Sequence, residues 1–132
     1  MKLLTKEIEK RFKEIGSQDG VKDPIVIVKF FNPTGGGTWW AIEYDPKYRI
    51  FFGYASIFGD HNDEWGSFSL IELESFTGKF GLGIERDLHC GEKKISEFNI
   101  PSLNKKQPPV SEASEDYPLG GMAEPYDIRG DR

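Results

Sequence analysis

The chain has 132 residues, of which 37% are hydrophobic, 14% aromatic and 30% charged, and its formal net charge is −5. This length fits one domain, and the acidic balance argues against the phosphate neutralisation on which non-specific nucleic-acid binding depends. A single cysteine, Cys90, excludes an intramolecular disulfide, and no apolar run has the length of a membrane span. Because the first residues also lack the pattern of a signal peptide, we expect a cytoplasmic protein.

The first predicted element is a helix over residues 5–15. Thr5 is a suitable N-cap, and Ile8, Phe12 and Ile15 follow at the spacing of one helical stripe. Gly16 is a typical residue to end the helix.

Three strands follow and predict an antiparallel meander. Residues 25–31 are β-branched or aromatic almost throughout, and residues 38–44 and 48–55 form two further strands. The glycine-rich residues 32–37 lack the Lys-Ser/Thr sequence of a phosphate-binding loop, so we interpret them as a hairpin loop. Asp45-Pro46-Lys47 has the residues that a type I turn prefers.

The strand at 38–44 has no face that looks solvent-exposed. Its alternation places Trp40, Ile42 and Tyr44 on one side and Trp39, Ala41 and Glu43 on the other. Either both faces of the sheet are covered, or one aromatic face is a binding surface.

The second half of the domain is expected to alternate short elements and loops. A polar loop over residues 58–64 precedes a capping box at Ser69–Glu72, which predicts a short helix with Leu73 and Phe76 facing inward and its end at Gly78. Residues 81–89 alternate well enough for a fourth strand, and 93–98 suit a helical turn. The fold class is therefore α+β: a meander of about four strands, an N-terminal helix, and one or two short helices packed on the sheet.

We place the domain at residues 1–100 and a Pro-rich tail at 101–132. Five of the eight prolines lie in the tail, but only two of the eighteen aromatic residues. A segment of this composition buries too little apolar surface to offset its ordering entropy, so we expect it to be flexible.

Several blocks resemble a small bacterial family catalogued as domain of unknown function 2958. They occur in the order Asp23–Pro33, Thr38–Pro46, Phe51–Tyr54, Glu64–Glu74 and Phe80–Asp87, and the resemblance runs from about Leu3 to Ser96. It implies a bacterial accessory protein of a plasmid, integrative element or phage. It brings no catalytic residues, although its pattern emphasises Glu43, Asp45, Glu64, Glu85, Arg86 and Asp87.

Two groups of residues are candidates for chemistry. Glu85, Asp87 and His89 share a face of the predicted fourth strand, where they could bind a divalent cation or provide a general base. The solvated face of an antiparallel sheet has the same composition. Cys90 lies next to His89, but neighbouring residues of a strand point to opposite faces, which argues against a nucleophile–base pair. Asp60–Glu64 fails the spacing of a calcium-binding loop.

The second group is aromatic. Trp39, Trp40, Tyr44, Tyr48 and Trp65 could stack nucleic-acid bases, but such platforms lie in basic grooves and the surrounding sequence is not basic. We expect these side chains to belong to the core.

Arg86 is expected on the apolar face of its strand, between Ile84 and Leu88, paired with a carboxylate of Glu43 or Glu72. The candidate functional surface comprises Trp39, Glu43, Asp45, Glu64, Trp65, Glu85, Arg86 and Asp87.

The leading hypothesis is a non-enzymatic protein-binding or regulatory module of a mobile element, and action against a host defence is one role that it could have. We expect it to use no cofactor or metal and to bind an unidentified protein partner. The alternatives are a metal-dependent or acid/base enzyme that uses the clustered carboxylates, and a single-strand nucleic-acid binder.

Overall fold

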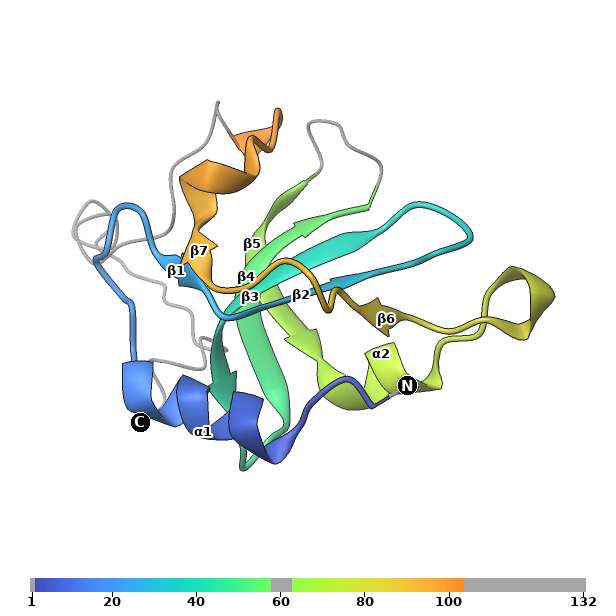
Figure 1. The fold of residues 1–132 in the computed structure, drawn as a ribbon, viewed down its shortest axis with the longest axis horizontal. Coiled ribbons are helices and arrows are strands. Elements are labelled where there is room, and N and C mark those ends of the chain that lie inside the picture. Colours follow the sequence, from blue (N-terminus) through green and yellow to red (C-terminus); the bar gives the residue numbers. More distant parts are fainter. Residues whose placement is uncertain (1, 58–62, 104–132) are drawn as a thin grey trace, which may run out of the picture.

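The computed structural model describes residues 2–57 and 63–103 (Figure 1). In chain order the elements are α1 (Lys6–Ile15), β1 (Ile25–Val26), β2 (Val28–Phe31), β3 (Thr38–Asp45), β4 (Ile50–Ser56), β5 (Glu64–Ser69), α2 (Leu70–Ser75), the 3₁₀ turn η1 (Lys79–Gly81), β6 (Glu85–Arg86), β7 (Lys93–Lys94) and the 3₁₀ turn η2 (Ile95–Phe98). The predicted α+β class is confirmed. None of the helices in this part of the chain has the length and apolar character needed to cross a membrane.

Helix α1 forms as the sequence predicts. The Thr5 side chain accepts a hydrogen bond from the Ile8 N–H at 3.1 Å, and Gly16 ends the helix at φ 71°. Phe12 is buried on the sheet, with Ile8 and Ile15 partly buried beside it. Local capping and a single apolar stripe therefore set both the length and the orientation of the helix.

The main sheet has five antiparallel strands in the order β5-β4-β3-β2-β6. The expected strand at 25–31 is divided, because β1 leaves this sheet to pair with β7 while β2 continues along β3. The register between β3 and β4 shifts between Ala41 and Glu43, which marks a bulge at Ile42. Opposite Ala41, Gly53 lies so close to β3 that an added Cβ would be 1.9 Å from the Trp40 carbonyl oxygen.

The second half of the domain departs from the prediction in three places. Residues 64–69 form the edge strand β5, which was not predicted, since the expected loop ended at residue 64 and the expected helix cap began at residue 69. The expected strand at 81–89 is only two residues long, because η1 and an extended connection occupy residues 79–84. Helix α2 ends at Ser75, so Phe76 is exposed rather than inward-facing, whereas Leu73 is buried as predicted.

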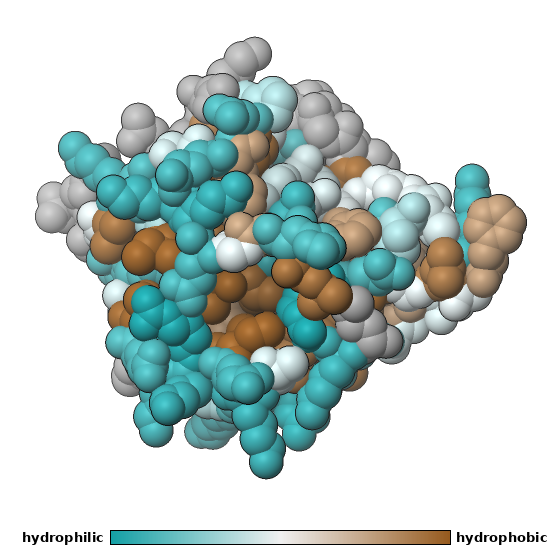
Figure 2. Space-filling model, viewed as in Figure 1, coloured by the Kyte–Doolittle hydropathy of each residue, from teal (hydrophilic) through white to brown (hydrophobic). Residues whose placement is uncertain are grey.

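Both faces of the sheet are covered, so the sheet is the middle of three layers. We call the face under α1 the first face; there the N-terminal segment, α1, α2 and Ile84 pack on Val28, Phe30, Ala41 and Phe51. On the second face, η2 and the residues after it pack on Val26, Trp40, Ile42, Phe52 and Tyr54. Figure 2 shows polar side chains over most of one side of the molecule, with hydrophobic side chains visible between them near its centre.

The chain stays on the second face as far as Leu103. Ile100 and Leu103 are buried in this layer, and the Ser102 hydroxyl bridges Tyr54 and Asp63 at 2.8 Å each. Residues 101–103, which the expected boundary assigned to the tail, are therefore packed against the domain. The remainder of the expected tail lies outside the described residues.

Candidate functional site

The candidate carboxylates are distributed over the sheet instead of meeting in one place. Glu64 begins β5 at one edge, whereas Glu85 lies in β6 at the opposite edge, with three strands between them. In residues 2–57 and 63–103 there is no group of three or more His, Cys, Asp or Glu side chains placed to hold a metal ion. The convergence of Glu64 and Glu85 that the metal-dependent or acid/base alternative invoked is therefore not found in this part of the chain.

The predicted face of Glu85, Asp87 and His89 is also wrong. Strand β6 ends at Arg86, and the Asp87 carboxylate then accepts a hydrogen bond from the His89 backbone N–H at 2.9 Å. The chain therefore turns at Asp87, while the other carboxylate oxygen lies 3.5 Å from the Lys29 ammonium on β2. Asp87 fixes a turn and a cross-strand ion pair at the sheet edge.

Arg86 ties the sheet edge to the N-terminal segment. It is half-buried beside β2, and its Nη1 donates a hydrogen bond to the backbone carbonyl of Lys2. The register places Arg86 level with Trp39, because both residues pair with Phe30, whereas Glu43 lies four residues further along β3. The register therefore separates Arg86 from Glu43, one of its two expected partners, and the structural role of the guanidinium agrees with the expectation.

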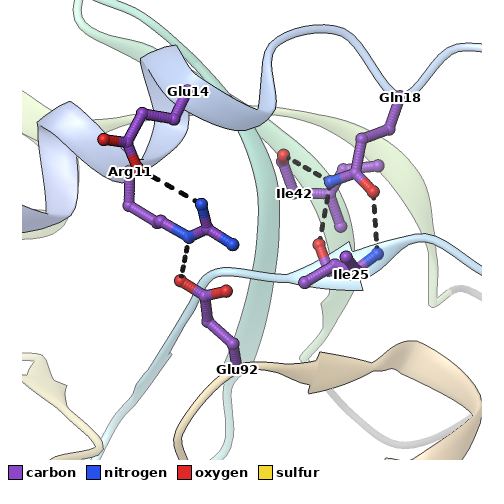
Figure 3. A network of polar contacts seen from close by, with 6 residues as sticks. All are labelled: Arg11, Glu14, Gln18, Ile25, Ile42 and Glu92. Carbon is purple, nitrogen blue, oxygen red and sulfur yellow. Dashed lines mark hydrogen bonds and ion pairs between the residues drawn. The ribbon is translucent and has the colours of Figure 1, made fainter.

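Glu43 is buried and binds the backbone of the segment that follows α1. Its Oε2 accepts a hydrogen bond from the Gln18 backbone N–H at 2.7 Å. The Gln18 side chain then donates to the carbonyl oxygens of Ile25 and Ile42, both at 2.9 Å, and accepts from the Ile25 N–H at 2.8 Å (Figure 3). Gln18 thus bridges β1 and β3 at the bulge, and no local pattern in the sequence marks it for this role.

A second polar group in Figure 3 lies at the surface. The guanidinium of Arg11 on α1 contacts Glu14 at 3.2 Å and Glu92 at 2.8 Å. These two hydrogen bonds, chiefly the one to Glu92, raise the pKa of Arg11 above its usual value. The contact between Arg11 and Glu92 connects α1 to the segment before β7 across the outside of the fold.

The aromatic candidates do not form one stacking platform. Trp40 and Trp65 belong to the second face, with both indole N–H groups buried and without a hydrogen-bond partner among the described residues, whereas Trp39 and Tyr44 pack on the first face. Tyr48 is exposed on the turn between β3 and β4, where the Lys47 ammonium lies 5.1 Å from its ring centre. The prediction that these side chains belong to the core agrees with the structure for four of them and is wrong for Tyr48. The expectation that Tyr44 shares a face with Trp40 is also wrong, because the bulge at Ile42 shifts the alternation of β3.

Cys90 and His89 show no sign of an activated thiol. Burial, reinforced by the Asp87 charge, raises the pKa of the Cys90 thiol, and its Sγ donates to the Gly91 carbonyl at 3.1 Å. A protonated thiol is a poor nucleophile. The geometry therefore gives no support to thiol catalysis at Cys90.

A groove of about 1040 Å³ lies between α1 and the turn that joins β3 to β4. Asp45 lies at this end of β3, where its side chain accepts the Lys47 backbone N–H at 2.9 Å and caps the predicted turn. The charged residues that line the groove have both signs: Lys6, Lys10, Lys13 and Lys47 with Glu9, Glu43 and Asp45. With interspersed charges and an open shape, the groove has no strong preference for an anion or a cation.

The most prominent exposed feature was not among the sequence candidates. Residues 76–84 form a loop that extends beyond the sheet between α2 and β6 (Figure 1), with hydrophobic side chains at its tip (Figure 2). Phe80 is 91% exposed, and Phe76 and Leu82 are about two-fifths exposed. We call this segment the projecting loop. The signal available in the sequence was its three glycines, which we assigned to a helix end and a strand.

Backbone hydrogen bonds close the projecting loop. The Gly78 N–H donates to the Leu82 carbonyl at 2.7 Å, and the Leu82 N–H donates to the Lys79 carbonyl at 3.1 Å. Phe80 has φ 60° and ψ 19°, in the left-handed region that a phenylalanine rarely adopts. An aromatic side chain is therefore presented to solvent on a closed and locally strained turn.

The comparisons with known proteins identify a family without assigning an activity. The model of DUF2958, described as a protein of unknown function, matches residues 3–101. This range includes the three layers and the projecting loop, and it ends two residues before the last described residue. No curated protein and no solved structure matches the chain. Because the family model covers most of the sequence, the chain belongs to the DUF2958 family.

Proposed function

We propose that this protein is a non-enzymatic protein-binding module that docks on its partner through the projecting loop. The observation that carries this proposal is Phe80, which is 91% exposed in a left-handed conformation at the tip of the loop. Exposed aromatic side chains are enriched at the centres of protein interfaces, where they fill pockets of the partner. Backbone strain of this kind is found mainly at functional sites.

The closed backbone of the loop supports the same function. A loop that is already held in its binding conformation loses less entropy on association. The hydrogen bonds of Gly78 and Leu82 provide such pre-organisation. Phe76 and Leu82 extend the apolar contact area around Phe80.

The family resemblance supports a more specific setting. A small acidic protein of a plasmid or phage, without a formed catalytic site in the described residues, suits an accessory role in the bacterial cytoplasm. Countering a host-defence protein is one form that such a role takes, and the projecting loop would then be the surface that contacts the host protein.

A photo-crosslinking experiment in the bacterial host tests the proposal. The full chain carries p-benzoylphenylalanine at position 80 or, as a matched control, at position 48, where Tyr48 is also an exposed aromatic residue but lies on the turn between β3 and β4. We expect a discrete adduct of higher mass for position 80 alone, with the partner identified by mass spectrometry. Adducts of equal yield at both positions, or none at position 80, would refute docking through the loop.

Replacing Phe80 by Asn separates binding from folding. Asn tolerates the left-handed region better than Phe, and a left-handed residue costs roughly 1–2 kcal/mol. We expect Phe80→Asn to unfold at the same or a slightly higher temperature than the wild type while its binding to the crosslinked partner, measured by calorimetry, falls at least tenfold. Unchanged binding would contradict the proposal.

A further inference from the structure

We propose that the outer edge of β5 pairs with β5 of a second copy of this chain, so that two five-stranded sheets form one continuous sheet. The proposal rests on the edge strand alone and is independent of the projecting loop. Strand β5 pairs with β4 on one side, and within residues 2–57 and 63–103 no strand pairs with it on the other. A sheet edge of this kind is a ready template for pairing with another chain.

The register identifies which backbone groups point outward. Leu70, directly after β5, donates its N–H to the Arg49 carbonyl at 3.0 Å, and the pairing of β5 with β4 continues this register. Opposite residues in an antiparallel ladder alternate between hydrogen-bonded and non-hydrogen-bonded pairs. Phe68, Gly66 and Glu64 therefore turn their backbone groups toward β4, while Trp65 and Ser67 turn theirs away from the sheet.

Apart from the exposed Glu64 at its start, the side chains of β5 lack the devices that usually protect an edge. Its sequence, Glu64-Trp65-Gly66-Ser67-Phe68-Ser69, contains no Lys, no Pro and no bulge. The other edge of the sheet differs, since β6 is only two residues long and is followed by the turn at Asp87. Protected edges are typically short, charged or bulged. By this criterion β5 is the edge left open.

Strand β5 is complementary to itself in one antiparallel register. With the two-fold axis at Gly66, Trp65 of each copy opposes Ser67 of the other, and these pairs use the outward N–H and C=O groups for four hydrogen bonds. Glu64 then opposes Phe68, so no like charges meet. An added Cβ on Gly66 would find nothing within 4 Å, which leaves the space at the axis open for close approach of the second strand.

This complementarity selects a second copy over an unrelated strand as the occupant. The same five residues supply both halves of the ladder, and isologous contacts of this kind close into a dimer and do not propagate. Phe68 also lies diagonally across from Gly66 of the other copy, within reach of the open space there.

Introducing a charge at position 66, on the proposed two-fold axis, tests the proposal. Gly66→Lys and Gly66→Glu each place two like charges directly opposite one another in the dimer, which is destabilising. The open space around Gly66 allows either side chain in the single chain. By sedimentation velocity at high micromolar concentration, we expect the wild-type chain and a Gly66→Ala control at twice the 15.0 kDa chain mass, and each charged variant alone at the single-chain mass. An equimolar mixture of the two charged variants should regain the dimer mass.

Hydrogen exchange provides a second measurement that does not depend on a substitution. The amides of Trp65 and Ser67 should become protected as the wild-type concentration rises, whereas those of Gly66 and Phe68 should be protected at every concentration. A single-chain mass for the wild type under these conditions, a dimer for either charged variant alone, or a mixture that fails to associate would overturn the proposal.

Discussion

The phenol hydroxyl of Tyr54 lies 2.8 Å from the hydroxyl of Ser102, which donates in turn to the buried carboxylate of Asp63 at 2.8 Å. Asp63 also accepts from the Ser56 hydroxyl at 2.7 Å. This chain of hydrogen bonds fastens residues 101–103 to β4 and to the start of β5. The domain therefore extends at least to Leu103, beyond the expected boundary at residue 100.

Two truncations test this boundary. A chain that ends after Leu103 should melt within a few degrees of the full chain, because the residues removed contain few large apolar side chains. A chain that ends after Asn99 loses the buried Ile100 and Leu103 and should be destabilised by about 3 kcal/mol or more. Thermal unfolding followed by circular dichroism measures both. Equal losses in the two chains would show that residues after Leu103 also support the fold.

Replacing Gln18 by Ala removes three hydrogen bonds that join β1 to β3. Backbone groups left without partners near the core should lower the free energy of unfolding by about 3 kcal/mol, measured by urea denaturation. The matched control is Arg11→Ala, which removes two exposed contacts and should leave stability nearly unchanged. A small effect at Gln18 would mean that water satisfies these groups.

Gly53 and Gly66 are paired across β4 and β5 but should differ in their tolerance of a side chain. An alanine Cβ at position 53 would lie 1.9 Å from the Trp40 carbonyl oxygen, whereas at position 66 it meets no atom within 4 Å. Gly53→Ala should therefore cost more than about 3 kcal/mol or prevent folding. Gly66→Ala should change the free energy of unfolding by less than about 1 kcal/mol. Comparable losses at the two positions would contradict the close approach at the bulge.

Tyr54 should make the protein sensitive to alkali. Burial raises the pKa of its hydroxyl, the charges of Asp63 and Glu64 add to this shift, and the Ser102 hydrogen bond opposes it. The pKa of Tyr54 in the folded state therefore lies above its unfolded value of about 10. The protonated hydroxyl contributes its full share to the free energy of unfolding below about pH 10, and this contribution is lost as the pH rises through the folded-state pKa.

Urea denaturation of the wild type and of Tyr54→Phe from neutral to alkaline pH measures this effect. At neutral pH the free energy of unfolding of the variant should be about 1 kcal/mol lower than that of the wild type, because the hydrogen bond to Ser102 is lost. Above about pH 10 the stability of the variant should fall less steeply than that of the wild type. Parallel pH profiles would show that Tyr54 does not contribute to the alkaline loss.

The elements that the sequence predicts well are those with strong local signals. Helix α1 has a capping residue, one apolar stripe and a glycine stop, and β3 and β4 are rich in β-branched and aromatic residues around a Pro turn. Strand β5 has no such signal, because glycine and serine at Gly66 and Ser67 are poor strand formers. It is a strand because β4 offers a partner along its whole length.

The candidate surface was harder to predict, since it depended on how distant residues meet. Alternation along residues 82–88 suggested a strand, but the pairing with β2 covers Glu85 and Arg86 and ends with the hydrogen bond from the Asp87 N–H to the Lys29 carbonyl. Once that strand is lost, the shared face of Glu85, Asp87 and His89 is lost with it. Glu43 was expected as a partner of Arg86, but its carboxylate accepts the Gln18 N–H, and Gln18 lies in a loop whose position depends on the whole fold.

Much of the cover on the first face comes from the start of the described chain and the cover on the second face comes from its end, and this arrangement has a kinetic consequence. Strands β3, β4 and β5 join neighbours in sequence, whereas Lys2 and Arg86 are 84 residues apart. Contacts of such long separation form late, because loop closure must precede them. We therefore expect folding to begin in the β3–β4–β5 meander and to pass through a state in which both faces of this sheet are bare. In that state the aromatic residues of both faces are available for aggregation, so refolding yield should fall steeply with protein concentration.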